Sequence, residues 1–123
     1  MRYLGIDFGL RRVGLAISDG ELASPYKILE GQRFNNLLEQ VKKESIGFDK
    51  VVVGMPQGKM GKTVLRFIKV LRKSGLDVIE TDETLSSKRA LTQVIEQGVS
   101  KKHRKFNDDT AAAIILQDWL DSQ

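Results

Sequence analysis

The sequence predicts an α/β protein in which a mixed five-stranded sheet is flanked by helices. Two observations predict this fold class. The chain begins with two short segments of alternating large and small residues, which are typical of a β-hairpin, and a third strand-like segment follows them. From residue 51 onward, strand-like runs instead alternate with helix-like segments. We therefore expect the first three strands to be antiparallel and the last two to be parallel.

The hairpin is predicted by two runs in which large side chains occupy one face. In residues 4–9 the large side chains alternate with two glycines and Asp7. Residues 13–18 repeat this alternation after a turn through residues 10–12. A third strand is expected over residues 26–29, so that the first three strands form one antiparallel unit.

The rest of the chain divides into helices and strands by the spacing of its apolar residues. A helix is expected over residues 37–46, with Asn35 or Asn36 as its N-cap. The unalternated apolar run at residues 51–54 is typical of a strand covered on both faces. The further elements expected are a helix from Val64 to a closing Gly75, a strand over residues 76–81, a helix from Ser86 or Ser87 to Gly98, and a helix over residues 108–120.

Length and composition restrict the class of protein. The 123 residues fit a single domain, residues 1–123, and 41% hydrophobic with 29% charged residues is typical of a globular protein. No segment approaches the roughly 20 apolar residues of a membrane span, and we expect a cytoplasmic protein. The absence of Cys excludes disulfides, thiolate metal sites and a cysteine nucleophile. A net charge of +4 suits a polyanionic partner.

Asp7 is the most informative acidic residue, because it lies within a predicted strand. If the first two strands pair, its carboxylate projects from a face of small residues, namely Gly5, Gly9, Gly14 and Ala16. Burying a carboxylate without a cation or donors costs on the order of several kcal/mol. The small neighbours therefore favour a hydrated metal ion and a phosphate beside Asp7. The alternative is a structural aspartate, hydrogen-bonded at the end of the sheet.

Further acidic residues are expected at the same edge of the sheet. Glu83 follows the fifth predicted strand, where ligands of α/β sheets gather, although a solvated loop acid is the alternative. Asp108 and Asp109 open the last predicted helix, where the helix dipole alone favours negative charge. Asp108 shares a helical face with Ala112 and Trp119, so it should point inward at the edge of the core. Three convergent carboxylates favour a nuclease with two divalent ions, and hard oxygen ligands select Mg²⁺ or Mn²⁺.

Four motifs occur in order along the chain. They are Gly5-Ile6-Asp7-Phe8-Gly9 with Arg12, Gly14 and Ser18-Asp19; Val52-Val53-Gly54-Met55-Pro56; Asp82-Glu83-Thr84-Leu85-Ser86; and Asp108 leading into Ala111-Ala112 and Ile115-Leu116-Gln117. With these motifs the chain resembles the YqgF/RuvX family over nearly its whole length. The resemblance implies a ribonuclease H-like fold and a catalytic, metal-binding triad of Asp7, Glu83 and Asp108.

The resemblance also implies a substrate, whereas the residues alone do not identify one. It points to a nuclease that processes the 5′ end of pre-16S rRNA, with ribosomal particles as candidate partners. The alternatives are a resolvase of four-way DNA junctions, which requires a dimer, and a non-cleaving RNA- or ribosome-binding module. Monomer and homodimer both remain open.

Two groups of basic residues accompany the acids. Arg11 and Arg12 flank the hairpin turn, and a basic segment precedes Asp108. That segment consists of Lys101, Lys102, His103, Arg104 and Lys105. We expect both groups to hold backbone phosphates, with a solvated charged loop as the alternative for the segment.

The chain departs from the family pattern at two places. Thr84 stands where the family usually has an arginine, and residues 57–61 replace a loop that usually carries an Asn and an Asp. Lys59 and Lys62 are candidate substitutes for the missing arginine. Gly61-Lys62-Thr63 resembles part of a nucleotide-binding loop, but position 56 is Pro where that loop requires Gly. Nucleotide hydrolysis is therefore not expected.

Overall fold

The structure, a computed structural model, describes residues 1–9, 11–31, 33–55, 60–82 and 108–123, with only the backbone described at 60, 82 and 108. Its elements in chain order are β1 (Tyr3–Phe8), β2 (Arg12–Ser18), β3 (Ala23–Glu30), α1 (Phe34–Glu44), β4 (Lys50–Met55), α2 (Met60–Lys73), β5 (Val78–Asp82) and α4 (Asp108–Asp121). The helix expected over residues 86–98 lies outside the described residues.

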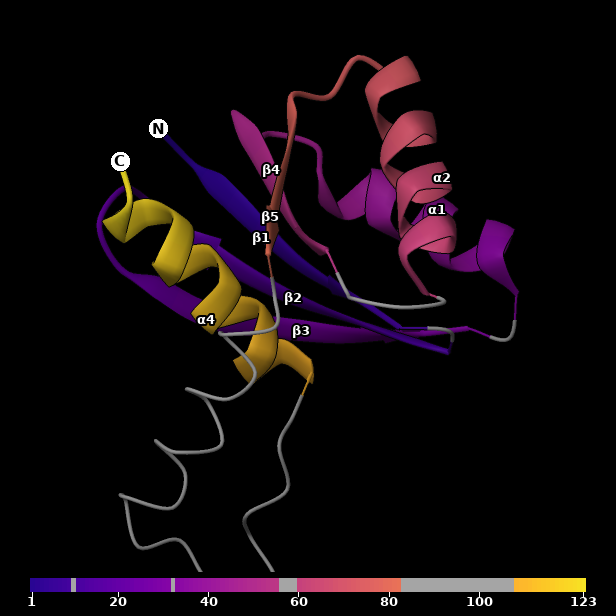
Figure 1. Cartoon of the computed structure of the whole chain (residues 1–123), viewed down its shortest axis with the longest axis horizontal. Helices are drawn as coiled ribbons and strands as arrows, with labels where there is room; N and C mark the ends of the chain where they lie inside the picture. Colours follow the sequence, from indigo (N-terminus) through magenta and orange to yellow (C-terminus); the bar gives the residue numbers. More distant parts are fainter. Residues whose placement is uncertain (10, 32, 56–59, 83–107) are drawn as a thin grey trace, which may run out of the picture.

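The strands form one mixed sheet with the order β3-β2-β1-β4-β5 (Figure 1). β2 pairs antiparallel with both β1 and β3, whereas β4 runs parallel to β1 and to β5. The predicted antiparallel and parallel halves are both confirmed. In the hairpin, Asp7 lies opposite Gly14 and Gly5 lies opposite Ala16, so the predicted shared face of Asp7 and these small residues is also confirmed.

Helices cover both faces of the sheet, and α1 and α2 lie on the face opposite to α4 (Figure 1). The larger core lies on the α1/α2 side, where β-branched and aromatic side chains of the strands meet apolar helix residues. Its largest fully buried side chain is that of Phe67 on α2. The smaller core lies under α4 and contains Ala112, Ile115 and Leu116 with Ala16 and Val52.

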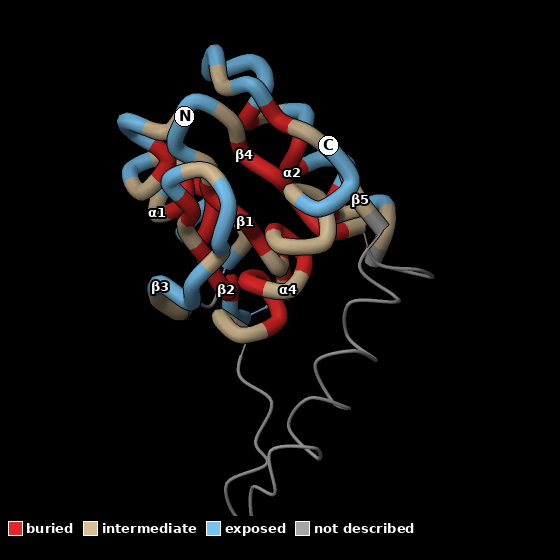
Figure 2. Tube along the Cα trace, turned by 90° about the vertical axis from the view of Figure 1, so that its left-hand side faces the viewer, coloured by how far each residue is buried: buried red, intermediate tan, exposed pale blue. Residues whose placement is uncertain are grey.

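Burial is greatest in the central strands and least in β3, which forms one edge of the sheet (Figure 2). β3 presents exposed residues over its first half and begins at Ala23, earlier than the expected residue 26. A register shift between Leu15 and Ala16 of β2 lies opposite this half.

Two details of α1 were predicted wrongly. Its N-cap is Arg33, which makes no side-chain cap hydrogen bond, and Asn35 and Asn36 lie inside the helix. The helix ends at Glu44, and Ile46 is 78% exposed rather than packed on the core. By contrast, Gly75 follows α2 with a φ of 91°, a conformation that favours glycine, as its predicted role requires.

Candidate active site

Asp7 is the penultimate residue of β1, the central strand of the sheet, and its side chain is half-buried. The parallel strands β4 and β5 end at the same edge, where Met55 pairs with Asp82. Ile6 pairs with Val53, so the row of Asp7 lies one residue before the end of β4. The carboxyl ends of three parallel strands therefore meet beside Asp7, the usual place for a ligand in such sheets.

α4 crosses the same face of the sheet and runs antiparallel to β1. The ring of Trp119 lies 5.3 Å from that of Tyr3 at the start of β1, whereas Gly5 lies against Ala112 and Leu116. Two strand residues rise about 6.6 Å, which equals roughly four helix residues. Asp7 therefore lies at the level where α4 begins, which is at Asp108.

The predicted inward face of α4 is confirmed. Ala112 is fully buried, Ile115 is 1% exposed and Trp119 packs at the border of the smaller core. Trp119 thus contributes to packing, as its helical spacing indicates. The backbone of Asp108 opens this face, although its side chain lies outside the described part of the structure.

Glu83 comes directly after Asp82, the last residue of β5, and lies outside the described residues. Ile79 of β5 packs with the α4 cluster. Because side chains alternate along a strand, Thr81 is on the same face of the sheet as Ile79 and Asp7. Within the described residues no three His, Cys, Asp or Glu side chains form a group that could hold a metal ion. The triad thus stays a prediction.

The glycines near Asp7 have structural reasons that differ from residue to residue. A Cβ on Gly5 would lie 2.8 Å from Leu116 Cβ and 3.0 Å from the Ala112 carbonyl oxygen. A Cβ on Gly9 would lie 2.7 Å from the carbonyl oxygen of Arg12, to which the Gly9 amide donates at 2.8 Å. Gly5 therefore allows α4 to pack closely on the sheet, and Gly9 allows the hairpin turn to form. Gly14 pairs directly opposite Asp7 and is buried.

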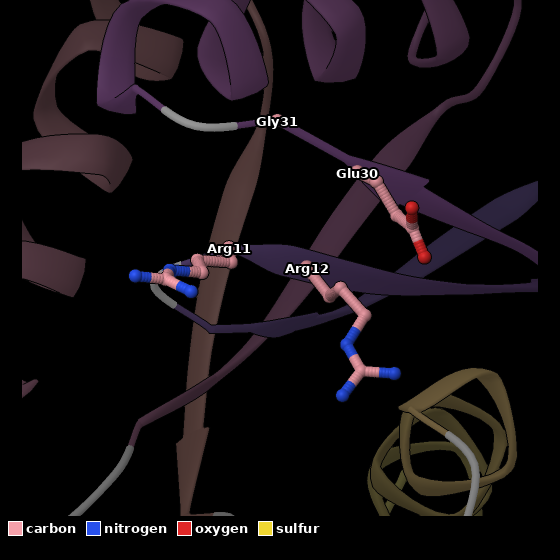
Figure 3. Close-up of a pocket in the computed structure, with 4 residues that line it drawn as sticks. All are labelled: Arg11, Arg12, Glu30 and Gly31. Atoms are coloured by element: carbon pink, nitrogen blue, oxygen red, sulfur yellow. The ribbon is translucent and has the colours of Figure 1, made fainter.

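Arg11 and Arg12 line an open cavity of about 770 Å³ together with Glu30 and Gly31 (Figure 3). The Arg12 side chain extends toward α4, drawn in yellow, whereas that of Arg11 extends away from it. Glu30 lies across from Arg12 in the β2–β3 pairing. Arg12 is thus the one of the two arginines on the Asp7 side of the sheet. The basic segment at residues 101–105 lies outside the described residues.

Two features were missed by the sequence analysis. Gln117 ties α4 to the turn before β3: its Oε1 accepts from the Ala23 amide at 2.8 Å and its Nε2 donates to the Glu21 carbonyl at 3.0 Å. α2 carries a row of outward cations at helical spacing. The spacing of these cations was readable in the sequence, whereas the partners of Gln117, 94 and 96 residues away, were not.

The described residues have the ribonuclease H-like fold. Thermus thermophilus RuvC, solved with a Holliday junction substrate, superposes with a TM-score of 0.63 at 16% identity, covering 99% of this chain and 94% of that one. Fowlpox virus resolvase, solved with junction DNA, gives 0.65 at 17%, covering 99% and 98%. At such identities these likenesses show the fold.

The chain belongs to the RuvX family, described as a Holliday junction resolvase, which matches residues 1–122. A Maridesulfovibrio salexigens relative is 39% identical over 98% of each chain, and a Bacillus thuringiensis relative is 40% identical over all of both. Both are provisionally named pre-16S rRNA nuclease. The predicted family and fold are confirmed, and the chain is a member of a nuclease family. No helix among the described residues is long and apolar enough to cross a membrane.

Proposed function

We propose that the protein is a metal-dependent nuclease of the cytoplasm that hydrolyses phosphodiester bonds in structured nucleic acid. Asp7, Glu83 and Asp108 are its catalytic and metal-binding carboxylates. One observation carries the proposal: a half-buried aspartate, the penultimate residue of the central strand, lies at the level where α4 begins. A carboxylate in such a position is stabilised by a cation.

The donor set of this chain fits Mg²⁺ or Mn²⁺. Carboxylate oxygens are the hard ligands that these ions prefer, and the chain offers no Cys and one His, His103. Two bound ions would supply an activated water and neutralise charge on the phosphodiester. Asp7, Glu83 and Asp108 would together hold these ions.

The cationic residues bind and orient the substrate in this proposal. Arg12 extends toward α4 (Figure 3), and it shares a face of the sheet with Gly14, the partner of Asp7, so it can hold a phosphate near the scissile bond. Arg11 and the segment Lys101, Lys102, Arg104 and Lys105 contact the backbone farther along. Such contacts are independent of sequence and weaken as salt rises.

The proposed substrate is the 5′ end of pre-16S rRNA, because the curated relatives carry that name at 39–40% identity over the whole chain. Ribosomal particles are then the natural partner. The second candidate is a four-way DNA junction, which is favoured by the description of the RuvX family and by two structural neighbours that were solved with Holliday junctions. Junction cleavage would need a homodimer that presents two sites, whereas rRNA processing can be carried out by a monomer.

The test is Mn²⁺-dependent cleavage of a pre-16S rRNA 5′ leader and of a synthetic four-way junction. Asp7→Asn should abolish cleavage, because the amide removes a charged metal ligand. The control is Asp77→Asn, the same change at the opposite end of β5, which should keep the wild-type rate. Cleavage retained by Asp7→Asn would refute the site. No cleavage of either substrate at any metal concentration would leave the nucleic-acid-binding module as the function.

A further inference from the structure

The outer side of α2 carries four cations in a straight row. Lys62, Arg66, Lys69 and Lys73 follow one another at intervals of four, three and four residues and are all exposed. At about 100° per residue they fall within roughly 60° of one another. The buried residues of the helix, Val64, Phe67, Ile68 and Leu71, lie on the opposite side. We call the four cations the α2 basic face.

The α2 basic face lacks acidic partners within the described structure. The 14 residues of α2 include no Asp or Glu, and no described carboxylate forms an ion pair with these four cations. Arg72, on the same helix but outside the row, does pair with Glu80 at 3.6 Å. On α1, Lys42 pairs with Glu39 at 3.4 Å. A row of like charges at such spacing is unfavourable unless an external anion neutralises it.

The row begins at the sheet edge where Asp7 lies. α2 starts five residues after Met55, the end of β4, so Lys62 belongs to the carboxyl edge of the parallel strands. The Arg66 guanidinium lies 5.1 Å from the ring centroid of Phe34, which packs at 6.0 Å against Phe8, the residue after Asp7. From there the row continues along the face opposite to α4. Its length from Lys62 to Lys73 is about 16 Å.

The chemistry of the row selects its ligand. A duplex carries one negative charge per roughly 1.7 Å of its axis, so a 16 Å row faces about nine phosphate charges. The exposed residues of α2 include no aromatic ring on which unpaired bases could stack. Its apolar side is buried in the core, whereas helices that bind membranes insert that side into lipid. A straight row of cations without ion pairs in the described structure, on a helix without exposed aromatic residues, therefore fits the phosphate backbone of a duplex.

We propose that the α2 basic face binds the phosphate backbone of the double-stranded arm that flanks the cleavage point. This inference rests on the proposed nuclease function, because it assigns the substrate a duplex that passes around the sheet edge beside Asp7. One strand of the nucleic acid enters on the face of the sheet that carries Asp7 and α4, and the flanking duplex lies along α2. The contact reads no base sequence, so it selects for double-stranded structure near the cut.

The test measures binding of 20-base-pair duplex RNA and DNA in EDTA, across a series of salt concentrations. Each phosphate contact with duplex DNA contributes about 0.9 to the slope of log affinity against log salt. Replacing Lys62, Arg66, Lys69 and Lys73 together by Gln should reduce the slope by about 3 to 4. The double variant Lys69→Gln/Lys73→Gln should reduce it by about 2, in case the fourfold variant folds poorly.

The matched control is Lys42→Gln/Lys43→Gln, which removes two charges from the last turn of α1 on the same side of the sheet. The control should leave the slope unchanged. An equal effect of the control, or an unchanged slope in the α2 variants, would overturn the proposal. Loss of binding to phosphatidylserine vesicles with unchanged duplex binding would overturn it as well. Because no metal is present, the result is independent of cleavage, whose failure would appear separately in the Mn²⁺ assay.

Discussion

At the scale of single residues, glycine decides how closely α4 approaches the sheet. The space above Gly5 is filled by Leu116, since a Cβ there would lie 2.8 Å from that residue's own Cβ. The glycine and the aspartate on this face of β1 therefore have separate roles. Gly5 is required for packing, and Asp7, two residues later, lies beyond the close contact and is half-buried.

One side-chain cluster at this scale has a defined response to pH. Lys27 of β3 donates to Glu44 of α1 at 2.8 Å, and the Tyr26 hydroxyl donates to the other Glu44 oxygen at 3.0 Å. The hydrogen bond from Lys27 lowers the pKa of Glu44, and the same bond raises the pKa of Lys27. The cluster joins an exposed edge strand to α1, so its charge state affects how firmly β3 is held.

We expect Glu44→Gln to reduce the loss of unfolding free energy that the wild-type protein shows as the pH falls. A carboxyl with a lowered folded-state pKa stabilises the protein above its unfolded pKa, and this stabilisation is lost as the pH falls through the folded pKa. Wild type should therefore lose stability relative to Glu44→Gln below about pH 4.3. Urea unfolding at a series of pH values measures the difference. The control is Glu39→Gln, whose side chain is 66% exposed; an identical profile in both variants would contradict the prediction.

At the scale of elements, the position of α4 on the sheet determines which residues meet at the candidate active site. Small residues on the sheet and Ala112 and Ala113 on the helix allow the close approach, and Gln117 fixes the helix against the turn before β3. The Gln117 side chain also donates to Asp121 at 2.9 Å, so it is held from its own helix as well. A shift of α4 along the sheet would move Asp108 relative to Asp7.

Gln117→Ala should destabilise the protein by about 1–3 kcal/mol, because the partly buried Ala23 amide loses its acceptor. Hydrogen exchange at Ala23 should become faster, and the urea midpoint should fall. Gln123→Ala serves as the control, since that glutamine lies at the exposed end of the chain. Unchanged exchange at Ala23 would show that the hydrogen bond does not hold the turn.

The sequence predicts those elements whose signal is local. Alternation over residues 4–9 and 13–18 predicts the hairpin and the face that carries its small residues, and the apolar run at residues 51–54 predicts a strand covered on both faces. The N-terminus of α1 could not be predicted in this way, because Arg33 caps it without a side-chain bond. The position of Ile46 was also wrong, since helical spacing continues past Glu44 while the helix does not.

The candidate site was predictable to a different degree. Asp7 could be singled out because a carboxylate interrupts an apolar strand, and alternation along both strands predicts that it shares a face with Gly14. The level of α4 relative to β1 depends on contacts between residues more than 100 positions apart, such as Tyr3 with Trp119. No local pattern encodes that alignment, and it is this alignment that supports a joint role of Asp7 and Asp108.

At the scale of the whole molecule, the proposed metal ligands come from three separate parts of the chain. Asp7 lies in the first strand, Glu83 follows the last strand and Asp108 begins the last helix. A ligand set of this kind does not exist in the unfolded chain, so metal binding should stabilise the native fold. The single tryptophan, Trp119, packs on Tyr3 and reports how α4 sits on β1.

Adding Mn²⁺ to the wild-type protein should raise its thermal midpoint, followed by the fluorescence of Trp119. At 100 times the dissociation constant, the gain is about 2.7 kcal/mol, which corresponds to a shift of several degrees. Asp7→Asn should lose most of this shift, because a proposed metal ligand loses its charge, while Asp77→Asn at the other end of β5 should keep it. A full shift in Asp7→Asn would place the bound metal elsewhere on the protein. Because this readout needs no nucleic acid, it tests the carboxylate site even for a protein that binds its substrate without cutting it.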